Sequence, residues 1–222
     1  KKIDGKYILI DFNSIVHVIS AHMISTVNKC IINKKKDCPY RYDSNDNFEK
    51  DLLKEINNYI LDLLKNNVES KNISTIYIAI DGVPTMAKIA EQKKRRYMGS
   101  LITHFVKEIK PPFDWVKNNI SPGTNFMNDL QKNLKSKELF SLIKDICPNL
   151  KKYIVSDTST PGEGEMKIID FIKNNIKESQ HNIIIYSPDS DMIILLMLLD
   201  KRLTILRYDQ QNSKLDERMN GK

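Results

Sequence analysis

The chain has 222 residues, of which 41% are hydrophobic and 28% charged, so it can form a folded core and is not wholly disordered. Its 35 Lys and Arg residues exceed its 28 Asp and Glu residues by seven. This surplus favours a polyanionic partner such as nucleic acid, although a solvated Lys-rich surface gives the same total.

The cysteines and apolar runs exclude several other classes of protein. Cys30, Cys38 and Cys147 are odd in number and widely spaced, which indicates reduced thiols, and neither they nor the four histidines have zinc-ligand spacing. The longest uninterrupted apolar run, residues 192–199, is far shorter than the roughly 20 residues of a membrane helix, and residues 1–4 lack a signal-peptide core. We therefore expect an intracellular protein, in the cytoplasm or nucleus, with no membrane partner.

Strands and helices are predicted to alternate along the chain. Apolar runs predict strands over residues 7–10, 73–80, 153–155, 182–186 and 203–208. Helical spacing predicts helices over residues 13–27, 48–64, 84–98, 136–146, 163–176 and 192–199, with loops over 28–47 and around 111–123. This order predicts an α/β fold, with a mostly parallel sheet flanked by helices on both faces.

Acidic residues follow the first four predicted strands. Because the carboxyl ends of parallel strands open onto one edge of a sheet, these acids are expected to meet there. They are Asp11, Asp81, Glu163, Glu165, Asp189 and Asp191.

Six carboxylates at one edge repel one another unless a cation lies between them. Oxygen ligands without His or Cys suit Mg²⁺ or Mn²⁺. Two such ions, roughly 4 Å apart, can activate a water and stabilise the leaving oxygen of a phosphodiester. Any one of these acids alone is more simply explained as a helix N-cap or a loop residue. The six together favour a site for two metal ions.

Two short motifs hold four of these acids. Residues 161–165 read Pro-Gly-Glu-Gly-Glu, in which glycines allow the backbone to approach a ligand and both carboxylates open a helix. Residues 187–191 read Ser-Pro-Asp-Ser-Asp after an apolar strand. An isolated Asp-x-Asp is commonly a helix cap, so its position after a strand carries the argument.

A basic face complements the acids. Lys88, Gln92, Arg95 and Arg96 have the spacing of one helix face, and such donors suit a terminal phosphate. A solvated basic face or a nuclear-localisation run explains the same residues equally well.

Five motifs in this order resemble the catalytic region of the XRN family of 5′-to-3′ exoribonucleases, within the PIN/flap-nuclease-like superfamily. Residues 11–17 are similar to the family's D-x-N-x-I-x-H, and residues 81–96 to its second signature. Residues 120–127 resemble its S/T-P-G-T-x-F-M segment. The motifs at 161–167 and 187–191 match its P-G-E-G-E-x-K and D-x-D segments.

The resemblance implies hydrolysis of single-stranded RNA from a 5′-monophosphate to mononucleotides, with two Mg²⁺ (or Mn²⁺) ions as cofactors. It assigns the metals and catalysis to Asp11, Asp81, Glu163, Glu165, Asp189 and Asp191. It assigns the 5′-phosphate, in a pocket too small for a cap or triphosphate, to Lys88, Gln92, Arg95 and Arg96. His17 would stack on the first base.

The sequence also departs from the family pattern. The family's catalytic domain is longer and has a further metal-binding aspartate, which neither Asp209 nor Asp216 matches, and Trp115 is not placed for base stacking. We therefore expect residues 1–222 to form a single nuclease domain that is incomplete at both ends, a truncated or viral form. A flap-endonuclease-like DNA nuclease and a non-catalytic RNA-binding remnant of the family stay open as alternatives.

Overall fold

The computed structural model describes residues 2–83, 89–90, 94, 97–98, 115–177, 181–209 and 214–219. These residues build one six-stranded sheet in the order β3-β2-β1-β4-β5-β6. The strands are β1 (Tyr7–Asp11), β2 (Thr75–Ala79), β3 (Lys152–Ser156), β4 (Ile183–Tyr186), β5 (Leu203–Asp209) and β6 (Lys214–Met219). Strands β1 to β5 run parallel to their neighbours, and β6 pairs antiparallel with β5.

The apolar strand sequences follow from burial on both faces of the sheet. Every residue of β2 and β4 is buried. In β1, Ile8 and Ile10 join one core cluster while Leu9, between them, joins a second cluster on the opposite face. The alternation of side chains along a strand thus gives the sheet two separate apolar cores.

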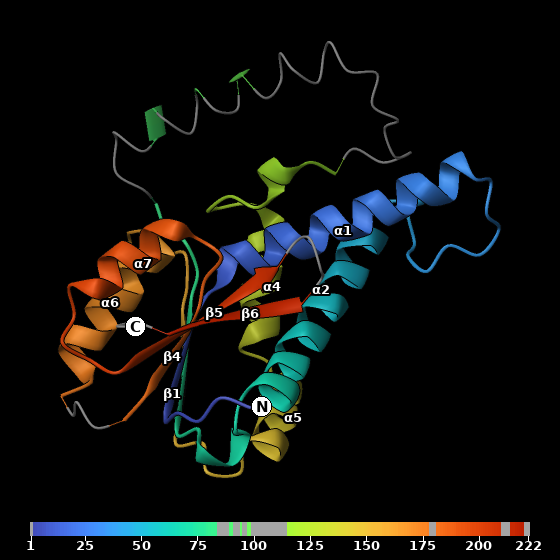
Figure 1. Ribbon diagram of the computed structural model, residues 1–222. Helices are drawn as coiled ribbons and strands as arrows, with labels where there is room; N and C mark the ends of the chain where they lie inside the picture. Colours follow the sequence, from blue (N-terminus) through green and yellow to red (C-terminus); the bar gives the residue numbers. More distant parts are fainter. Residues whose placement is uncertain are drawn as a thin grey trace.

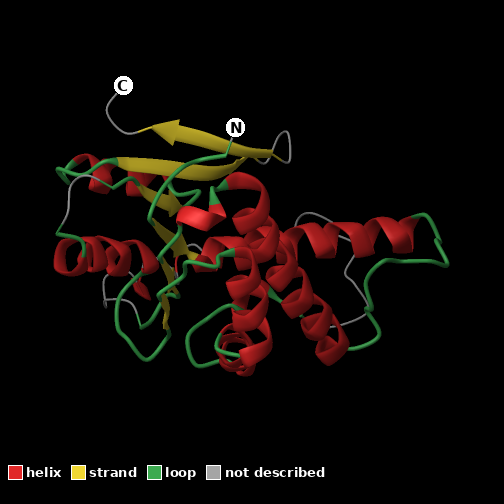
Figure 2. Ribbon diagram, turned by 90° about the horizontal axis from the view of Figure 1, so that it is seen from below, coloured by secondary structure: helices red, strands yellow, loops and turns green. Residues whose placement is uncertain are grey.

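Helices cover both faces of the sheet, as Figures 1 and 2 show. One face carries α1 (Phe12–Ile32), α2 (Asn45–Asp62), α4 (Asn125–Leu134) and α5 (Lys137–Ile146). The other face carries α6 (Gly164–Asn175) and α7 (Ser190–Met197). Short helical turns lie at Leu63–Asn67, Ser70–Asn72 and Lys117–Asn119. The predicted α/β class, mostly parallel and covered on both faces, is confirmed.

Some predicted boundaries were wrong. Residues 125–134 form α4, where no helix was predicted, because Thr124 caps the helix by accepting a hydrogen bond from the Met127 N–H. The predicted loop over 28–47 is shorter, since α1 continues to Ile32 and α2 begins at Asn45. Strand β6 was not predicted. Most of the predicted helix over 84–98 lies outside the described residues.

Helix α1 also corrects the membrane argument, which considered only uninterrupted apolar runs. By length and composition alone, α1 is apolar enough to cross a membrane. Nine of its residues, among them Phe12, Ile15 and Met23, are buried within the fold. Its apolar composition is therefore explained by packing against the sheet and α2, as for a core helix of a folded domain.

An aromatic cluster joins α2 and α4. The Trp115 ring lies 5.2 Å from the Phe48 ring and 6.0 Å from the Phe126 ring, measured between centroids. The indole N–H of Trp115 donates to Glu49 Oε1 at 2.9 Å. Trp115 is thus a buried packing residue with its polar atom satisfied, which agrees with its exclusion from base stacking.

This cluster gives a stability prediction. Phe126→Ala should lower the free energy of unfolding by about 3–5 kcal/mol, because it leaves a cavity beside Trp115. Leu142→Ala, at a position 49% exposed on α5, should cost less than about 1 kcal/mol. Urea denaturation of both variants measures the difference; similar costs would show that the Phe126 side chain is not a core residue.

Candidate functional site

Asp11 is the last residue of β1 and the N-cap of α1. Its side chain makes no capping hydrogen bond to the helix. Instead, its Oδ2 accepts a hydrogen bond from the Ser187 hydroxyl at 2.9 Å, across from the end of β4. An acid at an N-cap that does not cap its helix has its carboxylate directed to another task, here toward the edge of the sheet.

Asp81 follows β2 and is held by three hydrogen bonds. Its Oδ1 accepts from the Gly164 N–H at 2.7 Å, and its Oδ2 accepts from Asn13 Nδ2 at 3.1 Å. Its own N–H donates to Asn13 Oδ1 at 3.2 Å. These bonds tie the end of β2 to the first turns of α1 and α6, so the carboxylate position is fixed from two sides.

Gly164, the first residue of α6, lies against both aspartates. A Cβ atom added at Gly164 would come within 2.9 Å of Asp11 Oδ1 and 3.3 Å of Asp81 Oδ1. The turn before it contains Gly162, whose φ of +104° is unfavourable for residues with a side chain. The glycines of the 161–165 motif therefore let the start of α6 enter the space between two carboxylates.

The two glutamates of this motif open α6. Glu163 is the N-cap, without a side-chain capping bond, and Glu165 lies in the first turn. Glu165 is near enough to Asp11 to raise the pKa of that carboxyl group. Acids at a helix N-terminus are favoured by the helix dipole, which offsets part of their mutual repulsion.

The 187–191 segment partly follows the helix-cap interpretation. Asp189 is the N-cap of α7, and its Oδ1 accepts from the Asp191 N–H at 3.0 Å. The Asp189 N–H in turn donates to Ser187 Oγ at 3.2 Å, the hydroxyl that binds Asp11. Both Asp189 and Asp191 are exposed. One oxygen of Asp189 thus caps α7, while Ser187 connects the segment to Asp11.

The Asp11 carboxyl group is electrostatically unfavourable when ionised. Burial, followed by the charge of Asp81, raises its pKa from 3.8 to about 7, and Glu165 and Asp189 add to the rise. Only the Ser187 hydrogen bond opposes it. Three of the predicted acids therefore act on the fourth, which places Asp11, Asp81, Glu165 and Asp189 at one edge of the sheet.

The chemistry of this site fits a divalent cation. Its donors are all carboxylates, and a cation would relieve the burial and repulsion that raise the pKa of Asp11. Within the described residues, however, no three acidic, His or Cys side chains converge closely enough to form a ready metal cage. The arrangement is thus a set of clustered oxygen donors rather than a closed coordination shell.

Lys167 braces the same edge from beneath. It is only 6% exposed, and its Nζ donates to the Ile80 carbonyl at 2.6 Å and the Asp157 carbonyl at 2.8 Å. Burial lowers the pKa of this ammonium group, while Asp81 and Asp157 oppose the change. One side chain of α6 therefore joins the ends of β2 and β3.

The remaining predicted site residues are less constrained. His17 is exposed on α1, and partial desolvation followed by the charge of Lys117 lowers the pKa of its imidazole. A neutral imidazole near pH 7 suits stacking on a base. Lys88, Gln92, Arg95 and Arg96 lie outside the described residues.

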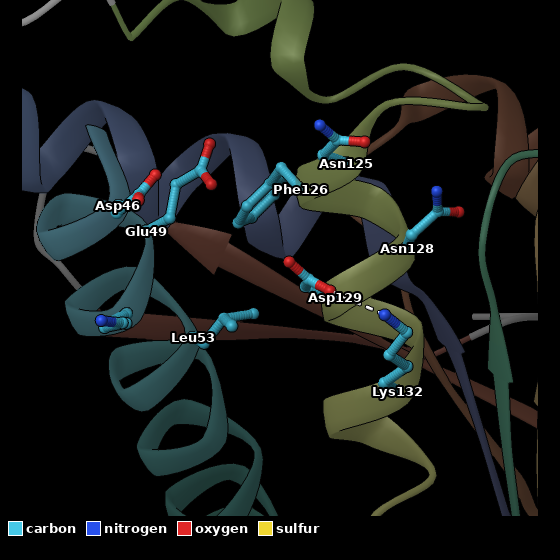
Figure 3. A pocket seen from close by; sticks show the side chains of 9 residues that line it. Asp46, Glu49, Leu53, Asn125, Phe126, Asn128, Asp129 and Lys132 are labelled. Atoms are coloured by element: carbon cyan, nitrogen blue, oxygen red, sulfur yellow. Dashed lines mark hydrogen bonds and ion pairs between the residues drawn. The ribbon is translucent and has the colours of Figure 1, made fainter.

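A second acidic hollow, of about 430 Å³, lies between α2 and α4 (Figure 3). Its acids already have partners within the protein: Asp129 pairs with Lys132 at 3.1 Å, and Glu49 accepts from Trp115 and Asn119. This hollow is therefore explained by the helix packing, unlike the strand edge.

Sequence reasoning gave no role to three residues that support the acids. Asn13, Ser187 and Lys167 are each less than 10% exposed and position the aspartates or their strand ends. The available signal was a polar residue beside an apolar run. Their partners lie 68, 176 and 87 residues away in the sequence, so only the fold reveals them.

Comparison with known proteins decides the family. The family described as XRN 5′-3′ exonuclease N-terminus matches residues 1–209. This chain belongs to that family. The relative named 5′-3′ exoribonuclease 2 of Schizosaccharomyces pombe is 34% identical over 158 residues, covering 60% of this chain and 16% of that protein.

Two further relatives agree. A putative 5′-3′ exonuclease of Acanthamoeba polyphaga mimivirus is 37% identical over 106 residues, covering 47% of this chain and 17% of that protein. The 5′-3′ exoribonuclease 2 of Aspergillus oryzae is 30% identical over 187 residues, covering 72% and 18%. This chain therefore spans less than a fifth of the length of these relatives.

The buried lysine can be tested by substitution. Lys167→Met should lower the free energy of unfolding by about 2 kcal/mol, because two buried carbonyls lose their donor. Lys173→Met, the same change at an exposed position of α6, should cost less than about 0.5 kcal/mol. Urea denaturation measures both costs, and equal values would remove Lys167 from this bracing role.

Asp11 gives a pH-dependent prediction. Because its pKa is raised to about 7 in the folded state, the folded protein holds an extra proton between about pH 4 and 7. Its contribution to stability is therefore lost as the pH rises through this range.

Removing this charge should stabilise the metal-free protein. In EDTA at pH 7.5, Asp11→Asn should raise Tm by roughly 4 °C or more, and the gain should shrink toward pH 4. Asp200→Asn, an exposed control, should leave Tm nearly unchanged. Thermal melts across this pH range make the comparison, and a pH-independent gain would contradict the raised pKa.

Proposed function

We propose that this chain is the N-terminal part of the catalytic domain of an intracellular 5′-to-3′ exoribonuclease. Its substrate would be single-stranded RNA with a 5′-monophosphate, hydrolysed to mononucleotides. The observation that supports this most is the meeting of Asp11, Asp81, Glu165 and Asp189 at one sheet edge, where burial and like charge call for a cation. Membership of the XRN 5′-3′ exonuclease N-terminus family sets the reaction class.

Two Mg²⁺ or Mn²⁺ ions would supply an activated water and neutralise charge on the departing 3′ oxygen. The residues proposed to hold them are Asp11, Asp81, Glu163, Glu165, Asp189 and Asp191. Asp11 and Asp81 offer the best-oriented carboxylates, because Ser187 and the pair Asn13 and Gly164 hold them in place.

The support for each acid differs. Asp81 is tied from two sides, so it provides a rigid ligand. Asp189 uses one oxygen for the α7 cap, which leaves Oδ2 to act toward a ligand. Asp191 is exposed and adjoins Asp189, so it would join a second ion nearer the solvent. Glu163 and Glu165 would approach from the α6 N-terminus.

The substrate end would be selected by charge and shape. Lys88, Gln92, Arg95 and Arg96 are proposed to receive the 5′-monophosphate, because Arg and Lys donors bind terminal phosphates. His17 is proposed to stack on the first base, for which its exposed position and lowered pKa are suitable.

The absence of a closed cage within the described residues favours one second candidate, a non-catalytic RNA-binding member of the family. Such a protein would bind RNA without binding Mn²⁺ at micromolar to millimolar concentrations. The nuclease predicts Mn²⁺ binding that Asp81→Asn weakens by roughly tenfold or more.

The 5′-end requirement is tested with three RNAs that differ only in a 5′-monophosphate, 5′-hydroxyl or 5′-triphosphate. With Mg²⁺, the monophosphorylated RNA should be degraded fastest and release mononucleotides. Equal decay of all three would refute recognition of the 5′ end, and preferential cleavage of flap DNA would favour the flap-endonuclease-like alternative. No decay would refute activity in this chain.

The metal site is tested separately. Asp189→Asn should reduce cleavage by roughly 100-fold or more while leaving RNA binding nearly unchanged, because the substitution removes a metal ligand but keeps the size of the side chain. Asp200→Asn, in the exposed segment after α7, is the matched control and should cleave normally. An unchanged rate in Asp189→Asn would remove this residue from the mechanism.

A further inference from the structure

The open edge of β3 is unlike the rest of the sheet. Among the residues that the structure describes, β3 pairs with β2 alone, and it forms one end of the strand order. Every residue of β2 is buried, but none of β3 is fully buried. This edge lies outside the proposed nuclease site, so its exposure calls for a separate explanation.

The backbone of β3 offers hydrogen-bonding groups at this edge. Its Lys152 N–H donates to Ser74, and its Ser156 carbonyl accepts from Ile80, so alternate residues face β2. By the two-residue period of a strand, Tyr153 and Val155 direct their N–H and C=O groups the other way. An extended chain laid along this edge would find a ready ladder of donors and acceptors.

A hollow of about 580 Å³ runs along the same edge, and its walls are apolar. Phe140 on α5 is 43% exposed there, and its ring lies 5.7 Å from that of Tyr153. Leu150, Ile154 and Val155 complete the apolar lining. Alternate side chains of an added strand would therefore enter an apolar hollow, while its backbone pairs with β3.

The charged lining is basic. Lys135, Lys137 and Lys151 surround the hollow, and Lys135 is paired with Asp157. Lys137 and Lys151 are exposed and have no acidic partner in the described part of the chain. These two lysines favour acidic residues on whatever binds there.

The same lysines disfavour a second copy of this chain. Two β3 edges paired with each other would bring lysines against lysines, the arrangement by which edge strands avoid self-association. We propose that the β3 edge is a docking site for an extended segment of another protein that alternates apolar and acidic side chains. The partner adds a strand to the sheet and places its acids beside Lys137 and Lys151.

The probe is a fluorescein-labelled ten-residue peptide of alternating Glu and Val, measured by fluorescence polarisation. Two control peptides carry Lys in place of Glu, or N-methyl groups that remove the hydrogen bonds along one edge. The protein should bind the acidic peptide, and bind both controls at least ~10-fold more weakly. Absence of binding at millimolar acidic peptide, or equal binding of either control, would overturn the proposal.

Variants of the protein locate the binding. The double variant Lys137→Glu/Lys151→Glu should weaken peptide binding by ~10-fold or more, whereas Lys29→Glu/Lys54→Glu, the same charge change elsewhere, should not. Val155→Pro removes one outward N–H and should also weaken it, while Val155→Ala keeps the N–H. Circular dichroism checks folding, and the surface lysine variants test the site even where proline unfolds the strand.

Two further outcomes would contradict the proposal. Equal losses in the two lysine double variants would show attraction by net charge alone. Dimerisation of the free protein, detected by light scattering and lost in Val155→Pro, would make a second copy the occupant of the edge.

Discussion

The carboxylate of Asp11 is the group on which the arrangement of the site depends. It ends the central strand β1, burial and three other acids oppose its ionisation, and one serine hydroxyl favours it. A folded chain keeps such a group only where surrounding structure fixes it or a ligand compensates it. Around Asp11, the glycine at the start of α6, the Asn13 contacts to Asp81 and the buried Lys167 all serve this fixation.

The parallel sheet explains why these groups meet. Strands β1, β2 and β4 are neighbours and point the same way, so the residues that follow them emerge at one edge. Positions 11, 81 and 189 are remote in sequence but follow adjacent strands. Helix α6 then begins at this edge, where its dipole favours the acids of the 161–165 motif. The fold thus collects negative charge in one place in a protein whose net charge is positive.

Much of this could be predicted from the sequence, because apolar runs ended by acids report both the strand and its end. The topology and the convergence of Asp11 with Asp81 followed from that pattern. The roles of Asn13, Ser187 and Lys167 did not, since a polar side chain beside an apolar run does not reveal its distant partner. Helix α4 was missed because Pro122 and Gly123 indicated a loop, although Thr124 is a good cap. Strand β6 was missed because its sequence, Lys-Leu-Asp-Glu-Arg-Met, shows no apolar alternation.

The central claim is that the acids at this edge hold a divalent cation, and crystals soaked in Mn²⁺ test it most directly. An anomalous difference map should show at least one peak bounded by carboxylates of Asp11, Asp81, Glu165 and Asp189, and crystals of Asp81→Asn should show a much weaker one. A map from well-ordered, Mn²⁺-saturated crystals with no peak at this edge would contradict the account.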